Sequence, residues 1–341
     1  MNFRMIDEER YSQIRDRIFN DYPDEVLRNI LPNQVISNLS SYDRVPDNFE
    51  LGYKNKNYQG SDYYIDPKQQ KFIHFTSLER LCNIISTNKI RLYDLNNVDD
   101  PNEIIFPLKQ VGADQDVDFN RVKSGVFSFS FCDFSTLADE KVEYNMWRLY
   151  GSDGNGVGIV FKFLNDCNAW DGYHLSKVYY EDAIKIQTIA DAIKSHEKFF
   201  STLNETFGFI NSISKENLLS EILNLFCFHK YGIYIYENEF RLVYRKNPYN
   251  YNVVYTISKH KKLSSYIEIP LGTIQNFQPL NDAPERPLIM IDEIILGHRY
   301  NEKECESLKG TLFEVNARNS ELFSTKTPQV SLTQLKKKYF S

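Results

Sequence analysis

The sequence predicts an α+β protein whose core is a mixed or antiparallel β-sheet flanked by helices. Apolar, strand-like segments outnumber helical ones in the middle of the chain, and long helical patterns separate them without a regular strand–helix alternation. Of the 341 residues, 42% are hydrophobic, so the chain can bury a large core and extended disorder is not expected.

The pattern divides the chain into three parts. Residues 1–65 are expected to be a helical N-terminal extension and linker, with helices at 5–20 and 24–31 and a polar loop over 40–70. Residues 66–300 form the α+β core domain, and residues 301–341 a tail that packs on the core. In the tail we expect a helix near 302–308, a strand at 312–315 and a basic end.

The core contains most of the expected elements. A helix over 78–87 follows a strand directly, with Ser77 as its N-cap, and residues 181–229 read as two amphipathic helices. The expected strands are 71–75, 90–93, 126–132, 157–163, 233–236, 240–244, 266–269 and 291–296.

Charge and cysteine usage narrow the class of protein. The formal net charge of −6 argues against nucleic-acid binding as a first hypothesis, because phosphate contacts need clustered Lys and Arg. The five cysteines are dispersed and form no C-x-x-C pair, which favours a reducing compartment and argues against disulfides and a structural zinc site. No signal peptide and no 18-residue apolar run is visible. We therefore expect a cytoplasmic protein without membrane association.

The segment FIHFTS (72–77) places polar groups at the end of an apolar strand. His74 precedes Thr76, and the backbone of Phe75 between them could clamp a planar amide. Burying such groups costs about 1–3 kcal/mol each unless they find partners. The alternative is a buried histidine bonded to backbone, with Ser77 acting only as a helix cap.

Two further segments combine polar and aromatic side chains. In FSFSF (127–131), strand alternation puts Ser128 and Ser130 on one face and three rings on the other. In MWRLYG (146–151), Trp147 and Tyr150 are three residues apart on a helix and could stack on a ring-bearing ligand. A half-exposed strand and plain core packing are the respective alternatives.

The segment YENEFR (236–241) carries two carboxylates. If it is a strand, Glu237 and Glu239 project side by side, so one of them should have a raised pKa or a cationic partner. Arg241 lies on the same face and could be that partner, in which case a structural Glu–Arg pair is the alternative.

As a set, these motifs resemble the bacterial domain-of-unknown-function family 2971. The resemblance runs in order over about 70–300 and rests on segments 72–79, 97–103, 129–131, 146–150 with 156–159, 236–242 and 291–297. The histidine-first strand, the Ser-x-Ser strand and the Glu-x-Glu segment also resemble motifs of ADP-ribosyltransferase-like domains.

That resemblance implies a split sheet and an NAD site. His74 would hold an NAD ribose hydroxyl, and Ser130 with Ser128 would support the nicotinamide pocket. Glu239 would bind the 2′-hydroxyl of the nicotinamide ribose, and Glu237 would orient the acceptor. The leading hypothesis is therefore an NAD-using ADP-ribosyltransferase-like enzyme, a bacterial defence or toxin effector, with NAD as substrate and a protein or nucleic acid as acceptor.

Two other functions remain open. Asp99, Asp100 and Glu103 with Glu237 could hold divalent ions in a hydrolase or nuclease, although a solvated loop explains the first three more simply. The third hypothesis is a non-catalytic module that binds a nucleotide or a protein partner. Under any of them, residues 1–35 could dock a protein partner.

Overall fold

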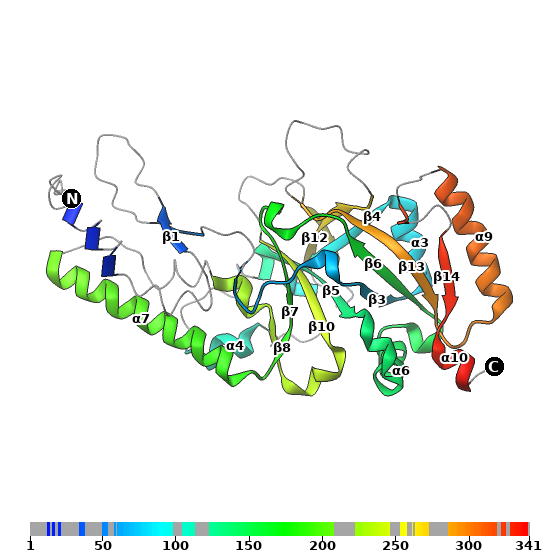
Figure 1. Cartoon of the computed structure of the whole chain (residues 1–341), viewed down its shortest axis with the longest axis horizontal. Helices are drawn as coiled ribbons and strands as arrows, with labels where there is room; N and C mark the ends of the chain where they lie inside the picture. Colours follow the sequence, from blue (N-terminus) through cyan, green and yellow to red (C-terminus); the bar gives the residue numbers. More distant parts are fainter. Residues whose placement is uncertain are drawn as a thin grey trace.

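The computed structural model describes most of the chain and has an α+β architecture. The described residues are 12–13, 16–17, 20–21, 34–37, 50–53, 58, 60–97, 104–112, 123–207, 222–245, 253–257, 261, 263–272, 286–318, 322–324 and 328–339. Figure 1 shows a large sheet with helices around it and one long helix, α7 (Ala183–Phe207), extending away from it.

Among these residues the main sheet has ten strands and is mostly antiparallel. Its strands are β3 (Phe72–Thr76), β4 (Lys89–Asp94), β5 (Val126–Asp133), β6 (Val157–Phe163), β7 (Tyr173–Lys177), β10 (Glu239–Arg245), β11 (Val254–Ile257), β12 (Leu263–Pro270), β13 (Ile289–Leu296) and β14 (Gln329–Leu332). They lie in the order β11-β12-β4-β5-β3-β6-β13-β14, and β10 pairs with both β5 and β7. Within this sheet only β13 and β14 are described as a parallel pair.

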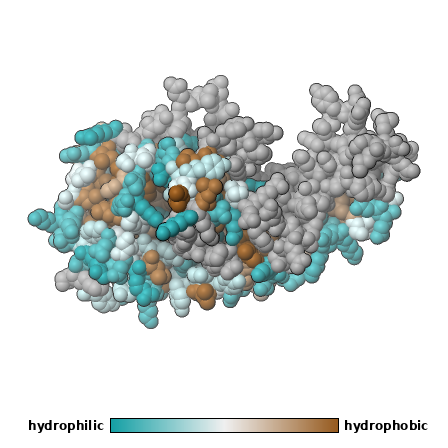
Figure 2. Space-filling view, turned by 180° about the vertical axis from the view of Figure 1, so that it is seen from behind, coloured by the Kyte–Doolittle hydropathy of each residue, from teal (hydrophilic) through white to brown (hydrophobic). Residues whose placement is uncertain are grey.

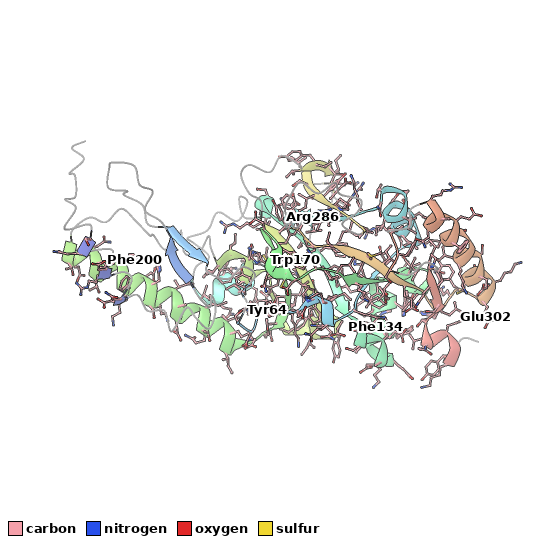
Figure 3. All side chains as sticks on the ribbon, turned by 45° about the horizontal axis from the view of Figure 1, so that its top comes forward. Tyr64, Phe134, Trp170, Phe200, Arg286 and Glu302 are labelled. Atoms are coloured by element: carbon pink, nitrogen blue, oxygen red, sulfur yellow. The ribbon has the colours of Figure 1, made fainter. Side chains whose placement is uncertain are left out.

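Two small sheets accompany the large one, and helices border it. The small sheets pair β1 (Gln34–Ser37) with β2 (Glu50–Tyr53) and β8 (Tyr179–Tyr180) with β9 (His229–Lys230). The other α-helices with stated bounds are α3 (Leu78–Thr87), α4 (Ile105–Gln110), α6 (Glu140–Leu149), α9 (Glu302–Arg318) and α10 (Gln334–Tyr339). The 3₁₀ helices are η2 (Pro67–Gln69), η3 (Leu95–Asn97), η4 (Phe134–Ala138), η5 (Ser152–Gly154), η6 (Cys167–Ala169) and η7 (Gly232–Glu237). Figure 3 places Phe200 on α7 and Glu302 at the start of α9 at opposite ends of the molecule.

The sheet opens at strand β5. On one edge, β10 pairs with β5 from end to end. On the other edge, β4 reaches only the start of β5, with Tyr93 opposite Ser128, and β3 reaches only its end, with Ile73 opposite Cys132. No described strand pairs with residues 129–131 on this second edge, so β3 and β4 diverge there.

The core lies against the sheet and is rich in aromatic rings. Phe72, Phe131, Phe161 and Phe163 are almost completely buried and contact one another with ring centroids 5.4–5.9 Å apart. Offset and edge-on contacts of this kind add to the burial of apolar area. Seen from behind, in Figure 2, the described surface shows hydrophobic residues as small separate groups among hydrophilic ones.

Most expected elements of the core are present. Strand β6 covers the predicted residues, and α3 begins after Ser77, whose hydroxyl accepts a hydrogen bond from the backbone N–H of Arg80 at 3.3 Å. Strands β3, β4, β5, β10, β12 and β13 match predicted ones within a few residues. The strand expected at 233–236 is wrong, because these residues belong to η7.

The ends of the chain differ more from expectation. Residues 312–315, expected as a strand, continue helix α9. Part of the expected loop is strand β2, and Tyr63 and Ile65, placed in the linker, are buried. Residues 12–13, 16–17 and 20 of the first predicted helix are helical, as is residue 21, whereas the helix expected at 24–31 lies outside the described residues.

Two further expectations concern cysteines and membranes. None of the five cysteines is in a disulfide bond, and four of them are buried as expected of small core residues, while Cys82 is exposed. Within the part of the chain that the structure describes, no helix is long and apolar enough to span a bilayer.

Candidate functional site

A cavity of about 900 Å³ lies where β3 and β4 diverge from β5. This volume is within the range of small-molecule and cofactor sites. Its walls include nine of the ten predicted site residues: His74, Phe75, Thr76, Ser128, Ser130, Tyr150, Glu237, Glu239 and Arg241. The structure therefore brings together side chains that are more than 160 positions apart in the sequence.

Glu239 is held by cations on two sides. The Arg241 guanidinium donates from Nε and Nη2 to Oε1 at 2.9 Å each and from Nη2 to Oε2 at 3.1 Å, while Lys230 Nζ lies 2.6 Å from Oε2. Burial alone would raise the pKa of Glu239, but Arg241, Lys230 and a hydrogen bond from Ser130 lower it to about 2. Glu239 is thus a permanent anion whose lone pairs are already occupied.

Glu237 has the opposite electrostatic character. Lys230 Nζ donates to its Oε2 at 2.8 Å, and the Tyr150 hydroxyl donates to its Oε1 in a short hydrogen bond. Burial, together with the charge of Glu239, raises the pKa of Glu237 against the lowering effect of Lys230 and Tyr150. Each oxygen of Glu237 accepts one hydrogen bond, which leaves capacity for a ligand.

The two carboxylates meet through a turn and not through strand alternation. Glu237 ends η7, Asn238 adopts a left-handed conformation with φ 42° and ψ 49°, and Glu239 begins β10. The expectation that both project from one strand face is wrong. It is correct for Glu239 and Arg241, which are two residues apart on β10 and in contact.

Lys230 lines the cavity but was not among the site residues predicted from the sequence. It lies in β9 and reaches both glutamates, seven and nine residues further along the chain. The preceding apolar run, which includes Phe226 and Phe228, reads as a helix, and the change to the polar pair His229-Lys230 is the local signal that could have drawn attention to it. Arg80, Lys89 and Arg91, which also line the cavity, were not predicted either.

The side chain of His74 contacts the part of β5, residues 129–131, that no described strand pairs with on the side of β3 and β4. Its Nδ1 lies 2.9 Å from the backbone oxygen of Ser130, and its ring packs on Phe129 with centroids 4.4 Å apart. Burial, with a contribution from Arg80, lowers the pKa of His74 to about 4, so the ring is neutral at pH 7. Because a carbonyl only accepts, Nδ1 carries the proton and Nε2 is left as an acceptor.

The serine strand is close to its predicted form. Phe127 and Phe131 are buried, whereas Ser128 is half-buried and Ser130 exposed, and both serines line the cavity. Phe129 also reaches the cavity wall, so the face is mixed and not purely polar.

Trp147 does not contribute to the site. Its side chain is completely buried, packs edge-on against Phe75 with centroids 4.9 Å apart and donates from Nε1 to Glu143 at 3.1 Å. The prediction that it stacks on a ligand is therefore wrong for this structure, since core packing determines its position. Tyr150, at the C-terminal cap of α6, is 40% exposed and does line the cavity.

A reactive cysteine or a metal centre would each need particular side chains in this cavity. Cys132 lies opposite Glu239, and burial with the two glutamate charges raises the pKa of its thiol well above the usual value. Among the described residues, no group of three or more His, Cys, Asp or Glu side chains is arranged to hold a metal ion. Asp99, Asp100 and Glu103 lie outside those residues, so their predicted metal site stays a prediction.

Comparison with known proteins gives a family match for one part of the chain. No curated protein and no solved structure matches the chain. The segments at 72–79, 97–103, 129–131 and 291–297, which carry part of the expected resemblance, lie outside residues 146–242, the part of the chain that a family model matches. A match to the model of the family described as "Protein of unknown function (DUF2971)" covers residues 146–242, a segment that includes Tyr150, Lys230, Glu237 and Glu239, so this part of the chain is similar to that family.

Proposed function

We propose that the cavity binds NAD and that the protein is an ADP-ribosyltransferase-like enzyme that cleaves the nicotinamide–ribose bond. One observation carries the proposal: the motif strand β5 pairs with both other motif strands, β3 and β10, and His74, Ser130 and Glu239 from these strands line one cavity. A hydrogen-bonded path links them, from His74 to the Ser130 carbonyl and from the Ser130 side chain to Glu239.

The groups around the cavity suit a ribosyl substrate. Neutral His74 offers Nε2 as an acceptor for a ribose hydroxyl, and Phe129 beside it offers a ring edge or face. Of the two glutamates, Glu237 fits direct contact with the substrate, because Glu239 is saturated by Arg241 and Lys230. Glu239 would act as a fixed charge behind it.

The reaction follows from this arrangement. The bond between ribose C1′ and the pyridinium nitrogen breaks, its electron pair neutralises the nitrogen, and nicotinamide leaves without needing a general acid. Positive charge develops on the ribose, and the carboxylates stabilise it. A hydroxyl of the acceptor, or water, then attacks C1′ and passes its proton to Glu237, which the raised pKa makes a stronger base.

Incubation of the purified protein with NAD, followed by mass spectrometry for free nicotinamide, tests the proposal. We expect release by the wild type and a loss of at least about a hundredfold in Glu237→Gln, as is typical of removing a general base. Glu314→Gln, on the exposed face of α9, is the matched control and should behave as wild type. Wild-type turnover in Glu237→Gln would contradict the assignment, and NAD binding without any turnover would favour the non-catalytic module.

A further inference from the structure

The wall of the cavity formed by α3 and β4 differs chemically from the glutamate wall. Strand β4 alternates half-buried and buried residues: Lys89, Arg91 and Tyr93 line the cavity, while Ile90 and Leu92 are buried in the core. Since β4 and β10 lie on opposite edges of β5, these cations face the cavity from the side opposite Glu239.

Arg80 adds a guanidinium group to this wall. It lies in the first turns of α3, lines the cavity and is exposed. No described residue makes an ion pair with its side chain. It is near enough to His74 to help lower the pKa of that ring, so it belongs to the same site and not to the outer surface of the helix.

One neighbouring carboxylate, that of Glu268, holds the other two cations without using all their donors. Glu268 accepts from Lys89 Nζ at 2.7 Å and from Arg91 Nε at 3.3 Å, and the Arg91 guanidinium lies 4.6 Å from the centre of the Tyr266 ring. Lysine has three donor hydrogens and arginine five, so donors remain on both. Glu79 also lines this wall.

Thr76 also lines the cavity, and its buried hydroxyl is unsatisfied among the described residues. The residue is 2% exposed, and the unsatisfied atom is its Oγ1. Buried hydroxyl groups in native proteins are rarely left unsatisfied. The hydroxyl can donate to an anionic oxygen, which a cluster of guanidinium and ammonium groups also attracts.

From these features we infer that Arg80, Lys89, Arg91 and Thr76 form an anion subsite that binds the diphosphate group of a nucleotide. Arginine forks match phosphate oxygens in two-point hydrogen bonds, and lysine contributes a point charge. The inference rests on the proposed function for the identity of the ligand as a dinucleotide. The subsite would hold its diphosphate on the α3–β4 wall, while the ribose to be cleaved lies against His74 and Glu237.

Calorimetric titration of the full chain with ADP, adenosine and inorganic pyrophosphate tests the subsite by binding alone. We expect ADP to bind at least about tenfold more tightly than adenosine, and Arg80→Gln and Arg91→Gln each to weaken ADP about tenfold or more without changing adenosine affinity. Pyrophosphate should compete with ADP. Arg318→Gln, an exposed arginine of α9 that does not line the cavity, is the matched control.

The outcomes separate this inference from the proposed function. Equal binding of ADP and adenosine, an undetectable ADP signal, or unchanged ADP affinity in both arginine variants overturns the subsite. Diphosphate binding that depends on Arg80 and Arg91, in a protein that releases no nicotinamide, supports the subsite and removes the enzyme assignment. Because Arg80 is exposed and unpaired among the described residues, its variant should fold as the wild type, which thermal unfolding checks.

Discussion

Glu237 and Glu239 share the ammonium group of Lys230, yet their pKa values move in opposite directions. Lys230 Nζ is 2.8 Å from one carboxylate and 2.6 Å from the other. The second carboxylate also has Arg241, and this additional cation accounts for the difference. With Arg241 and Lys230 both charged, the net charge of the cluster is set by whether Glu237 is ionised.

Lys230→Met should destabilise the protein more at high pH than at low pH. Without the ammonium group, the pKa of Glu237 rises further above its unfolded value, so the folded state binds more protons and stability falls as pH rises through that window. The loss at pH 8 should be about 3–5 kcal/mol, as for other broken buried pairs. Urea unfolding at pH 5 and pH 8 measures it.

The matched control for that change is Lys177→Met, at an exposed position on β7. It should alter stability by less than about 0.5 kcal/mol at either pH. An equal loss at pH 5 and pH 8 in Lys230→Met would mean that the lysine acts through packing and not through the charge of Glu237.

The left-handed residue between the two glutamates gives a second prediction. Asn238 has φ 42° and ψ 49°, a conformation that asparagine and glycine adopt readily and β-branched residues do not. Asn238→Gly should therefore change stability by only a few tenths of a kcal/mol, Asn238→Ala should cost about 1 kcal/mol, and Asn238→Val more. Chemical denaturation of the three variants checks the order, and a valine variant as stable as the glycine one would exclude backbone strain as the cause.

The same turn shows why sequence reasoning was only partly successful. Residues 233–236 are all β-branched or aromatic, which predicts a strand, yet they lie in the 3₁₀ helix Gly232–Glu237, with Ile233 76% and Tyr236 65% exposed. Strand propensity needs a neighbouring strand and a face to bury, and no described strand pairs with this segment. By contrast, β6 was predicted within its observed bounds because it is buried along nearly its whole length.

For the cavity, the sequence predicted most of the polar side chains that line it but not their contacts. His74, Ser130, Glu237 and Glu239 could be predicted because polar residues interrupt apolar segments there. The contact of Lys230 with the glutamates could not be predicted, because it depends on the pairing of β9 with β8, which no local pattern encodes.

Acidification should destabilise the protein through its buried histidines. Burial lowers the pKa values of His74, His174 and His229 to about 4 from the unfolded value of 6.5. Between pH 4 and pH 6.5 the unfolded chain binds more protons than the folded one. The free energy of unfolding therefore rises as the pH increases from 4 to 6.5, and it falls again on acidification. Glu237, with its raised pKa, acts in the opposite direction with a single proton.

One histidine allows a clean test of this slope. His174 stacks on Tyr58 with ring centroids 4.8 Å apart, and its Nδ1 has no partner among the described residues. His174→Phe should keep the stack and reduce the pH dependence of the unfolding free energy between pH 4 and 6.5, because the contribution of this imidazole is removed. A slope as steep as that of the wild type would assign the acid sensitivity to other groups.

Trp147 and Tyr150 should respond to mutation in different ways, although they are one helical turn apart. Trp147→Phe removes a buried donor to Glu143 and leaves a cavity, so it should cost about 2–3 kcal/mol of stability while nucleotide affinity stays within about twofold. Tyr150→Phe removes the donor to Glu237 at the cavity wall, so it should raise the pKa of Glu237 and change NAD binding or turnover with a smaller loss of stability. Thermal unfolding and calorimetry on both variants separate the two effects. Weaker NAD binding in Trp147→Phe at unchanged stability would mean that the indole ring contacts the ligand.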